Sequence, residues 1–236
     1  MKQPAAEPCD VLVIGGGPAG ATAASLLAEA GRHVIVLEAE AHPRFHIGES
    51  LLPRNLALFD RLGLRDQVEA LGVFKPGAEF VSDATGKSVA FAFAAGRAGF
   101  THAYHVRRAE FDAALLACAR NRGALVRERT RALDIGFASG DRSRVTAREA
   151  GGTALAFAPR FVIDASGHDG FLAGRLGLRL ADKRGSTAAV FAHYRGIEPR
   201  AADRAGYITI HLTQDGWFWT IPLPGEITSL GFVGTK

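Results

Sequence analysis

The segment from Asp10 to Glu38 constrains the fold of this chain more than any other part of the sequence. It opens with a continuous apolar run, DVLVI at 10–14, of the kind that a buried parallel strand requires. The glycine-rich sequence GGGPAG follows, and then a stretch rich in alanine and leucine that ends at Gly31. A second apolar run, HVIVLE, ends on an acidic side chain. This order predicts strand, tight turn, helix and strand, as in an α/β fold of the Rossmann kind.

The glycine-rich turn indicates which kind of ligand this unit can bind. Its G-x-G-x-x-G spacing provides a tight turn, backbone N–H groups that can approach a pyrophosphate, and close packing of helix on strand. The helix N-terminus favours phosphate, and the acid after the second strand can accept hydrogen bonds from ribose hydroxyls. With both strands and the acid in place, a FAD or NAD site is favoured over a purely structural glycine turn. The candidate cofactor-binding residues here are Gly15, Gly17, Pro18, Ala19, Gly20 and Glu38.

The composition excludes several other classes of protein. Of 236 residues, 47% are hydrophobic and 22% charged, as in a globular protein of one large or two modest domains. The net charge of +4 is carried mostly by scattered arginines, which predicts a solvated surface and no nucleic-acid partner. No signal peptide and no run long enough to span a membrane is recognisable. Two cysteines, Cys9 and Cys118, predict no disulfide framework and fit a reducing cytoplasm.

Three further motifs follow the glycine-rich unit. Segment 41–53 (AHPRFHIGESLLP) is a polar loop that runs into a predicted helix over 53–70, with Ser50 as its expected N-cap. YHVRRAEFDAALL, at 104–116, continues into a second helical pattern. PRFVIDASG, at 159–167, predicts a late strand that returns to the first sheet.

These motifs, in this order, resemble the FAD-dependent monooxygenase and halogenase superfamily. The resemblance implies that Glu38 contacts the adenosine ribose. Composition alone would make Arg44 and Arg107 surface charges. Only their positions within the motifs make them candidates for cofactor binding. The further cofactor contacts that the resemblance implies are Arg44, Ser50, Arg107, Asp164 and Gly167.

Lys75 differs from the other lysines of the chain in its surroundings. It lies in LGVFKPGAEF, among apolar side chains, between the predicted helix and a predicted strand at 78–83. A Pro-Gly turn follows it directly. Desolvation would lower the pKa of such an amine and make it a better nucleophile or hydrogen-bond donor. The alternative is a loop lysine whose ammonium reaches solvent.

Both tryptophans of the chain lie in GWFWTIP at 216–222. Alternation along a strand places Trp217 and Trp219 on one face of a sheet and Phe218 on the other. Such a pair serves either as part of a packed core or as a rigid aromatic wall.

G-W-x-W-x-I-P is the pattern typical of flavin-dependent halogenases, and every fixed position, including Pro222, is present. Lys75 falls where those enzymes carry a lysine, and AAVFAHYRGI at 188–197 is similar to one of their strands. The set resembles the phenol- and pyrrole-type halogenases more than those acting on free tryptophan. The resemblance assigns Lys75 as the catalytic residue, and Trp217, Trp219 and Pro222 as a barrier between flavin and substrate.

The resemblance implies halogenation of an electron-rich aromatic or pyrrole ring through hypohalous acid. The cofactors would be FAD, as FADH2, and chloride or bromide, with O2 as oxidant. An ammonium at Lys75 would stabilise the hydroxide that leaves hypohalous acid. A separate flavin reductase is expected as partner, because no second nicotinamide-binding unit is recognisable. The sequence leaves open the organic substrate, whether it is free or tethered to a carrier protein, and the oligomeric state.

Three alternatives stay open. A flavin reductase of the geranylgeranyl type shares the glycine turn and a GES-like loop but would need no Lys75. An aromatic hydroxylase would oxygenate its substrate directly, and GWFWTIP disfavours it. The third is a truncated or split flavin-binding chain without activity of its own, because the family carries a late D-A-x-x-x-x-D-P-like segment that this sequence lacks.

The fold that the resemblance implies is that of the aromatic hydroxylases, with the C-terminal part missing. It consists of a Rossmann-like FAD-binding domain, at 1–75 and 101–182, and an interleaved antiparallel substrate-side sheet, at 76–100 and 183–236.

No metal site is predicted, because His46, His105 and His193 lack the spacing of metal ligands.

Overall fold

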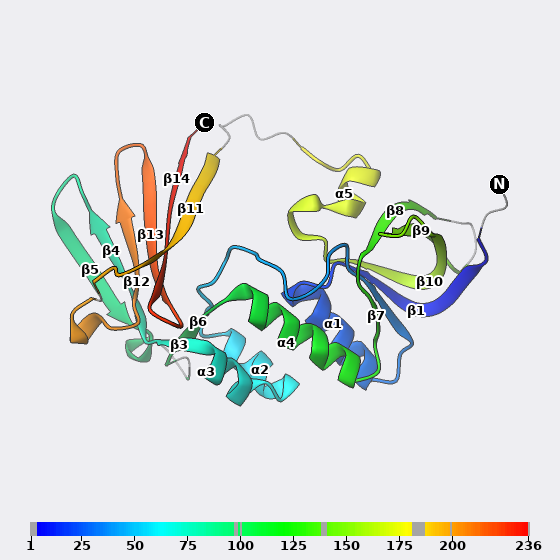
Figure 1. The fold of residues 1–236 in the computed structure, drawn as a ribbon, viewed down its shortest axis with the longest axis horizontal. Coiled ribbons are helices and arrows are strands. Elements are labelled where there is room, and N and C mark those ends of the chain that lie inside the picture. The colour runs from blue at the N-terminus through cyan, green and yellow to red at the C-terminus, as the bar shows by residue number, and fades with distance from the viewer. Residues whose placement is uncertain are drawn as a thin grey trace. The chain divides into compact units, whose positions relative to one another are not determined.

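Figure 1 shows the computed structural model of the chain, which describes residues 4–96, 99, 101–137, 141–180, 187–198 and 200–235. The chain forms two compact units, each built from two separate segments. The first unit comprises Met1–Phe45 and Asp112–Leu180, and the second His46–Phe111 and Ala181–Lys236. The domain boundaries expected from the motifs fall elsewhere and stay a prediction. Those at 100/101 and 182/183 involve residues outside the described part of the chain.

The first unit contains a six-stranded sheet of order β7-β2-β1-β10-β9-β8. Its four strands from β7 to β10 are parallel, whereas β9 and β8 continue the sheet in antiparallel fashion. The bounds are β1 Ala6–Ile14, β2 Val34–Leu37, β7 Leu125–Arg127, β8 Thr130–Gly136, β9 Arg144–Glu149 and β10 Ala154–Asp164.

Apolar runs in β1 and β2 form the centre of this unit. Leu12, Ile35 and Leu37 are buried in one cluster with Phe157 of β10. The strands predicted at the two ends of the glycine-rich unit are therefore confirmed, as is the late strand that returns to the same sheet. β1 begins at Ala6, earlier than its apolar run, because it pairs with β10 from that residue onward.

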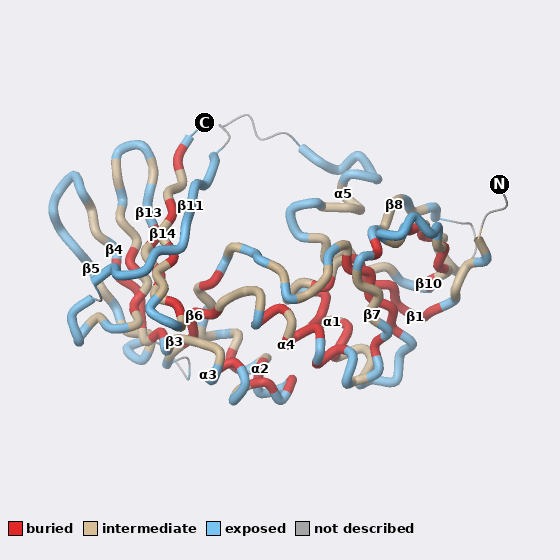
Figure 2. Tube along the Cα trace, in the orientation of Figure 1, coloured by how far each residue is buried: buried red, intermediate tan, exposed pale blue. Residues whose placement is uncertain are grey.

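Helices α1 (Pro18–Glu29), α4 (Arg108–Asn121) and α5 (Phe171–Arg175) accompany this sheet. α1 contacts β1 and β2 and starts one residue after Gly17, with a proline in its first turn. Figure 2 shows buried stretches along α1 and along the strands beside it. The first four residues of α4 belong to the second unit and the rest to the first.

The second unit contains a six-stranded sheet of order β11-β14-β13-β12-β4-β5. All neighbouring strands are antiparallel except β12 and β4, which are parallel. The bounds are β4 Gly77–Ser82, β5 Lys87–Ala92, β11 Thr187–Arg195, β12 Ile208–Leu212, β13 Gly216–Leu223 and β14 Ile227–Thr235.

Trp219, Ile221 and Leu223 of β13 form the buried centre of this sheet. Every residue of β11 is exposed, although the strand pairs with β14 over its whole length. Figure 2 shows this contrast between β11 and the interior of β13.

Two short strands, β3 (Gly72–Lys75) and β6 (Ala103–Val106), form a separate antiparallel pair in the second unit. The single helix predicted over 53–70 is wrong: it is two helices, α2 (Asn55–Leu62) and α3 (Arg65–Leu71). They are separated because Gly63 ends α2 in a left-handed conformation, with φ +68°. The remaining described helical turns are the 3₁₀ segments Phe93–Ala95, Gly167–Asp169 and Ala202–Arg204.

Ser50 does not cap a helix, which corrects the expectation from sequence. α2 begins after Arg54, and Ser50 instead forms an isolated β-bridge with His105 of β6. Among the described helices none is long and apolar enough to cross a membrane.

Candidate functional site

The glycine-rich turn of the first unit is packed so tightly that two of its positions accept only glycine. Gly15 has φ +103°, and a Cβ there would lie 2.4 Å from the carbonyl oxygen of Ala165. A Cβ at Gly20 would lie 1.9 Å from the carbonyl oxygen of Gly15. Gly17 is open by comparison, since the nearest atom to a Cβ there would be Arg44 Nη2, at 3.7 Å. The turn can therefore admit a phosphate group beside Gly17 and Arg44.

Glu38 lies directly beneath this turn. Its side chain is buried, Oε2 accepts a hydrogen bond from the backbone N–H of Gly16 at 2.7 Å, and Oε1 accepts one from Glu40 at 2.9 Å. A carboxylate oxygen can accept more than one hydrogen bond, so both oxygens keep capacity for a ribose hydroxyl.

Arg44 and His42 bring unused polar atoms to the same place. Arg44 Nε lies 3.6 Å from Glu38 Oε1, and His42 Nε2 lies 3.9 Å from Glu38 Oε2. Both ring nitrogens of His42 and the Nε of Arg44 are buried without a hydrogen-bond partner among the described residues. Burial, and next the charge of Arg44, hold the pKa of His42 below its ordinary value. Buried orphan nitrogens beside a phosphate-accepting turn fit a dinucleotide cofactor.

His42 was not singled out from the sequence, although it lies in the same loop as Arg44. A lone histidine in a polar loop carries no distinguishing pattern. Only the contact with Glu38 and the burial of its ring reveal it.

Asp164 and Gly167 shape the turn that follows β10. Asp164 Oδ1 accepts hydrogen bonds from the backbone and hydroxyl of Ser166, at 3.1 and 2.5 Å, and Oδ2 accepts one from the N–H of Leu172 at 2.7 Å. Gly167 has φ +62°. These bonds hold the turn whose Ala165 contacts Gly15, and the predicted cofactor contacts of both residues stay predictions.

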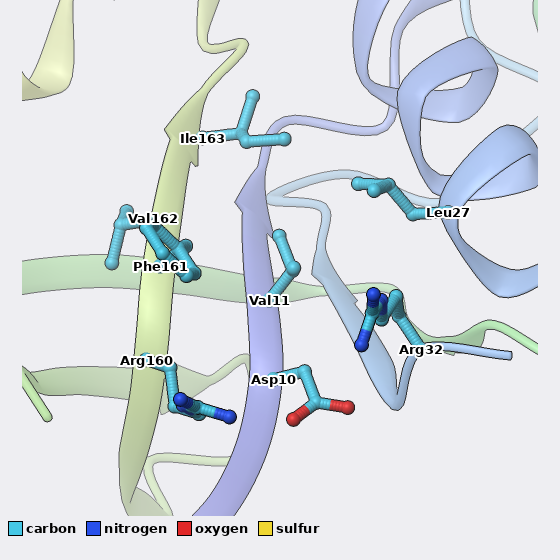
Figure 3. Close-up of a pocket in the computed structure, with 8 residues that line it drawn as sticks. All are labelled: Asp10, Val11, Leu27, Arg32, Arg160, Phe161, Val162 and Ile163. Carbon is cyan, nitrogen blue, oxygen red and sulfur yellow. The ribbon is translucent and has the colours of Figure 1, made fainter. Parts of the chain in front are cut away.

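A cavity of about 510 Å³ lies elsewhere on the first unit (Figure 3). It is formed by β1, β10 and the C-terminal part of α1, with apolar walls and charged groups at one end. No residue of the glycine-rich turn lines it, so it is separate from the predicted dinucleotide site. Its lining residues are Asp10, Val11, Leu27, Arg32, Arg160, Phe161, Val162 and Ile163.

In the second unit, Lys75 is the last residue of β3, and its side chain is buried, with 3% of the residue exposed. Its Nζ donates a hydrogen bond to the carbonyl oxygen of Leu51 at 2.9 Å and lies 5.2 Å from the centre of the Phe93 ring. Burial lowers the pKa of Lys75 to about 8. The alternative of a loop lysine that reaches solvent is therefore wrong, because the amine is enclosed.

His105 is a buried neighbour of this amine. Its Nε2 is 2.9 Å from the carbonyl oxygen of Gly206, and its Nδ1 has no hydrogen-bond partner among the described residues. Burial, and next the charge of Lys75, lower the pKa of His105 to about 3. The imidazole is therefore neutral, and it leaves the lysine as the only one of the two that carries a charge at neutral pH.

Arg107 Nη2 donates a hydrogen bond to the carbonyl oxygen of Pro224 at 2.6 Å, in the turn between β13 and β14. This contact anchors the guanidinium within the second unit. The predicted contact of Arg107 with the cofactor stays a prediction, as does that of Ser50, whose Oγ is buried without a hydrogen-bond partner in the described part of the chain.

The two tryptophans share a face of β13 as alternation predicts, but their surroundings differ. Trp219 is 7% exposed and Trp217 37%, with ring centres 5.9 Å apart. Trp219 Nε1 donates a hydrogen bond to Ser229 Oγ at 3.1 Å. Trp219 thus belongs to the core, whereas Trp217 presents a half-open ring. The predicted barrier that they form with Pro222 stays a prediction.

Comparison with known proteins decides the family. A family model described as a FAD binding domain matches residues 8–225. The chain belongs to this FAD-binding domain family. The chain is also similar to flavin-dependent halogenases.

Three relatives illustrate the similarity. A tryptophan 2-halogenase of Chondromyces crocatus is 36% identical over 94% of this chain, and a 1H-pyrrole-2-carbonyl-[peptidyl-carrier protein] chlorinase of Pseudomonas fluorescens is 33% identical over 96%. The solved structure of the flavin-dependent halogenase CmlS superimposes with a TM-score of 0.89 at 36% identity over 99% of this chain. The α/β fold predicted from the sequence is thereby confirmed.

The FAD-binding domain spans about half the length of the curated relatives that it matches. It covers 42% of the tryptophan 2-halogenase, 56% of the pyrrole chlorinase and 42% of CmlS.

Within the described residues no group of three or more histidine, cysteine or acidic side chains could hold a metal ion.

Proposed function

We propose that this FAD-binding domain is the N-terminal portion of a flavin-dependent halogenase that acts on an electron-rich aromatic or pyrrole ring. The single observation that carries the proposal is the buried amine of Lys75, held by the Leu51 carbonyl beside the Phe93 ring. With a pKa of about 8, this amine exists in both protonation states near neutral pH. A hydroxylase or an isoprenoid reductase would not need such a group.

When bound, reduced FAD would activate O2, the oxidant that converts chloride or bromide into hypohalous acid. The residues that would hold it are Gly15, Gly17, Gly20, Glu38 and Arg44, with His42 as an addition from the structure. Their role is to bind the pyrophosphate and ribose and to keep both in place.

Lys75 acts in the halogen-transfer step. Its ammonium donates a proton to the oxygen of hypohalous acid while a ring carbon attacks the halogen and the halogen–oxygen bond breaks. Water leaves, and the proton that the ring then loses restores the ammonium. Hypohalous acid and the arene are thus consumed, and the halogenated arene and water are produced. The buried site favours this step, because a donor in a low-dielectric environment stabilises developing negative charge strongly.

Trp217, Trp219 and Pro222 would separate the flavin from the organic substrate. The partly open ring of Trp217, on the same strand face as Trp219, supports this assignment. A separate flavin reductase would supply FADH2. The carrier-bound pyrrole in the name of one relative makes a carrier-tethered substrate part of the proposal.

The test is halogenation by the purified chain. Wild type, Lys75→Ala and the control Lys87→Ala, an exposed lysine on β5, receive photoreduced FAD, oxygen, bromide and a panel of phenols and pyrroles. Mass spectrometry should find the bromine isotope pattern with wild type and control, but not with Lys75→Ala. Equal bromination by Lys75→Ala would overturn the assigned role.

A second candidate follows from the length of the chain relative to its matches. This second candidate is a flavin-binding chain that halogenates no substrate on its own. FAD binding by wild type, measured by quenching of flavin fluorescence, without product from any substrate would favour this second function.

A further inference from the structure

Glu49, the acid of the GES sequence, is joined to β11 of the second unit. Its carboxylate is buried, with 1% of the residue exposed, and Oε1 lies 2.6 Å from Nε2 of His193. Oε2 is also buried and has no hydrogen-bond donor among the described residues. A carboxylate in such a place depends strongly on the contact it has, because an unpaired buried charge is costly.

The same short segment holds the amine of Lys75. Leu51, two residues after Glu49, provides the carbonyl oxygen that accepts the hydrogen bond from Nζ. The backbone of the segment pairs with β6, since Val106 N–H donates to Glu49 O at 2.9 Å and Leu51 N–H donates to Tyr104 O at 3.0 Å. The segment 49–51 is therefore tied to β6 through its backbone and to β11 through the Glu49 side chain.

The β11 end of this link leads to the tryptophan motif. His193 pairs across the sheet with Ser229 of β14, and Ser229 Oγ accepts the hydrogen bond from the indole of Trp219. The GES sequence and GWFWTIP, which are far apart in the chain, are thus connected through His193 and Ser229, which pair between β11 and β14.

We propose that Glu49 and His193 form a positioning pair for the Lys75 amine. The pair fixes the segment 49–51 against β11, so that the Leu51 carbonyl keeps Nζ in its buried place. This inference rests on the proposed function only for its catalytic consequence, since the positioning of Lys75 can be measured without a reaction. Neither residue needs to touch the substrate.

Loss of the pair should open the segment while the fold remains. His193 is partly exposed, so its replacement removes little packing. The Glu49 carboxylate would then be buried without a donor in the described part of the chain, and it would turn toward water. The backbone pairing with β6 would persist, but Leu51 would no longer hold the amine as closely.

The titration of Lys75 reports this change directly. In lysine-labelled protein, its NMR signal is assigned by its absence in Lys75→Arg and followed with pH. His105 is the neighbouring titratable side chain, and its neutrality keeps it from masking the effect. His193→Ala should shift the pKa of Lys75 upward toward the ordinary lysine value of about 10.4. His193→Gln, which keeps an N–H donor for Glu49, should restore the wild-type titration.

Two further variants make the test specific. Tyr194→Phe, on the opposite face of the same strand, should leave the titration unchanged. Glu49→Gln keeps an oxygen that can face His193 and should shift the pKa less than His193→Ala. An unchanged Lys75 titration in folded His193→Ala would overturn the proposal.

Kinetics separate this inference from the proposed function. If wild type halogenates, His193→Ala should lower kcat on the order of tenfold with little change in KM, because a displaced catalytic group is lost from the reacting geometry. More hypohalous acid should then escape and be trapped in solution. If wild type does not halogenate, the chain has no halogenase activity of its own, while a shifted Lys75 titration still supports the positioning pair.

Discussion

The indole of Trp219 covers the α-carbon of Gly231 on the neighbouring strand. A Cβ at position 231 would lie 2.2 Å from Cζ2 of that ring, in contact with a side chain that the core encloses. The glycine and the tryptophan therefore form one packing unit.

Gly231→Ala should destabilise the chain by about 1–3 kcal/mol, because the added methyl group overpacks this contact. Urea unfolding followed by tryptophan fluorescence measures the change. Gly136→Ala is the matched control, since a Cβ at that strand position meets nothing within 4 Å. Equal stability of the two variants would contradict the packing argument.

Gly20→Ala should weaken FAD binding, by more than about tenfold, because its Cβ would press on the Gly15 carbonyl and displace the turn. Flavin fluorescence titration measures the affinity. Gly151→Ala, where a Cβ has open space, serves as the control. An affinity equal to that of wild type would show that the turn does not bind the cofactor.

Raising the pH from about 8 to about 10 should stabilise wild type relative to Lys75→Met. Burial holds the pKa of Lys75 at about 8 in the folded chain, whereas an unfolded lysine has a pKa of about 10.4. Between these values the unfolded chain binds more protons, so the free energy of unfolding rises with pH. Below pH 8 the buried ammonium lowers that free energy by on the order of 3 kcal/mol.

Urea unfolding of both proteins across this pH range tests the prediction. Burial raises the pKa of Cys9 to about 11, which lowers stability at high pH, but it does so equally in both proteins. The difference between them isolates Lys75. A difference that stays constant with pH would contradict its buried titration.

The rate of halogen transfer should fall as the pH rises through about 8, because the proposed donor is the ammonium of Lys75. The difference between the pH profiles of wild type and Lys75→Ala, with hypohalous acid supplied directly, measures this step without the flavin, because the ionisation and the uncatalysed reaction of hypohalous acid affect both proteins equally. A rate that rises with pH would instead indicate attack by the free amine. Tyr194→Phe should reproduce the wild-type profile.

Much of the first unit could be predicted from the sequence because its signals are local. The apolar runs, the glycine turn and Glu38 lie within one short segment. The runs indicate strands, the glycines a tight turn, and the acid a ribose contact. GWFWTIP likewise specified a strand with both indoles on one face.

Other features depend on contacts between distant residues. Gly63 splits a helical pattern through its left-handed conformation, and Ser50 bridges to His105 instead of capping a helix. Glu49 lies 144 residues from His193, and no periodicity connects them. The orphan nitrogens of His42 likewise become visible only through burial.

The pairing of β1 with β10 has a consequence for synthesis on the ribosome. Ala6 pairs with Ala156, so the central strand of the first unit gains this neighbour only after the chain has been translated as far as β10. Until then one edge of β1 is open to other chains, and contacts so distant in sequence form slowly. During translation this open edge is therefore where nascent molecules of this protein should associate with one another.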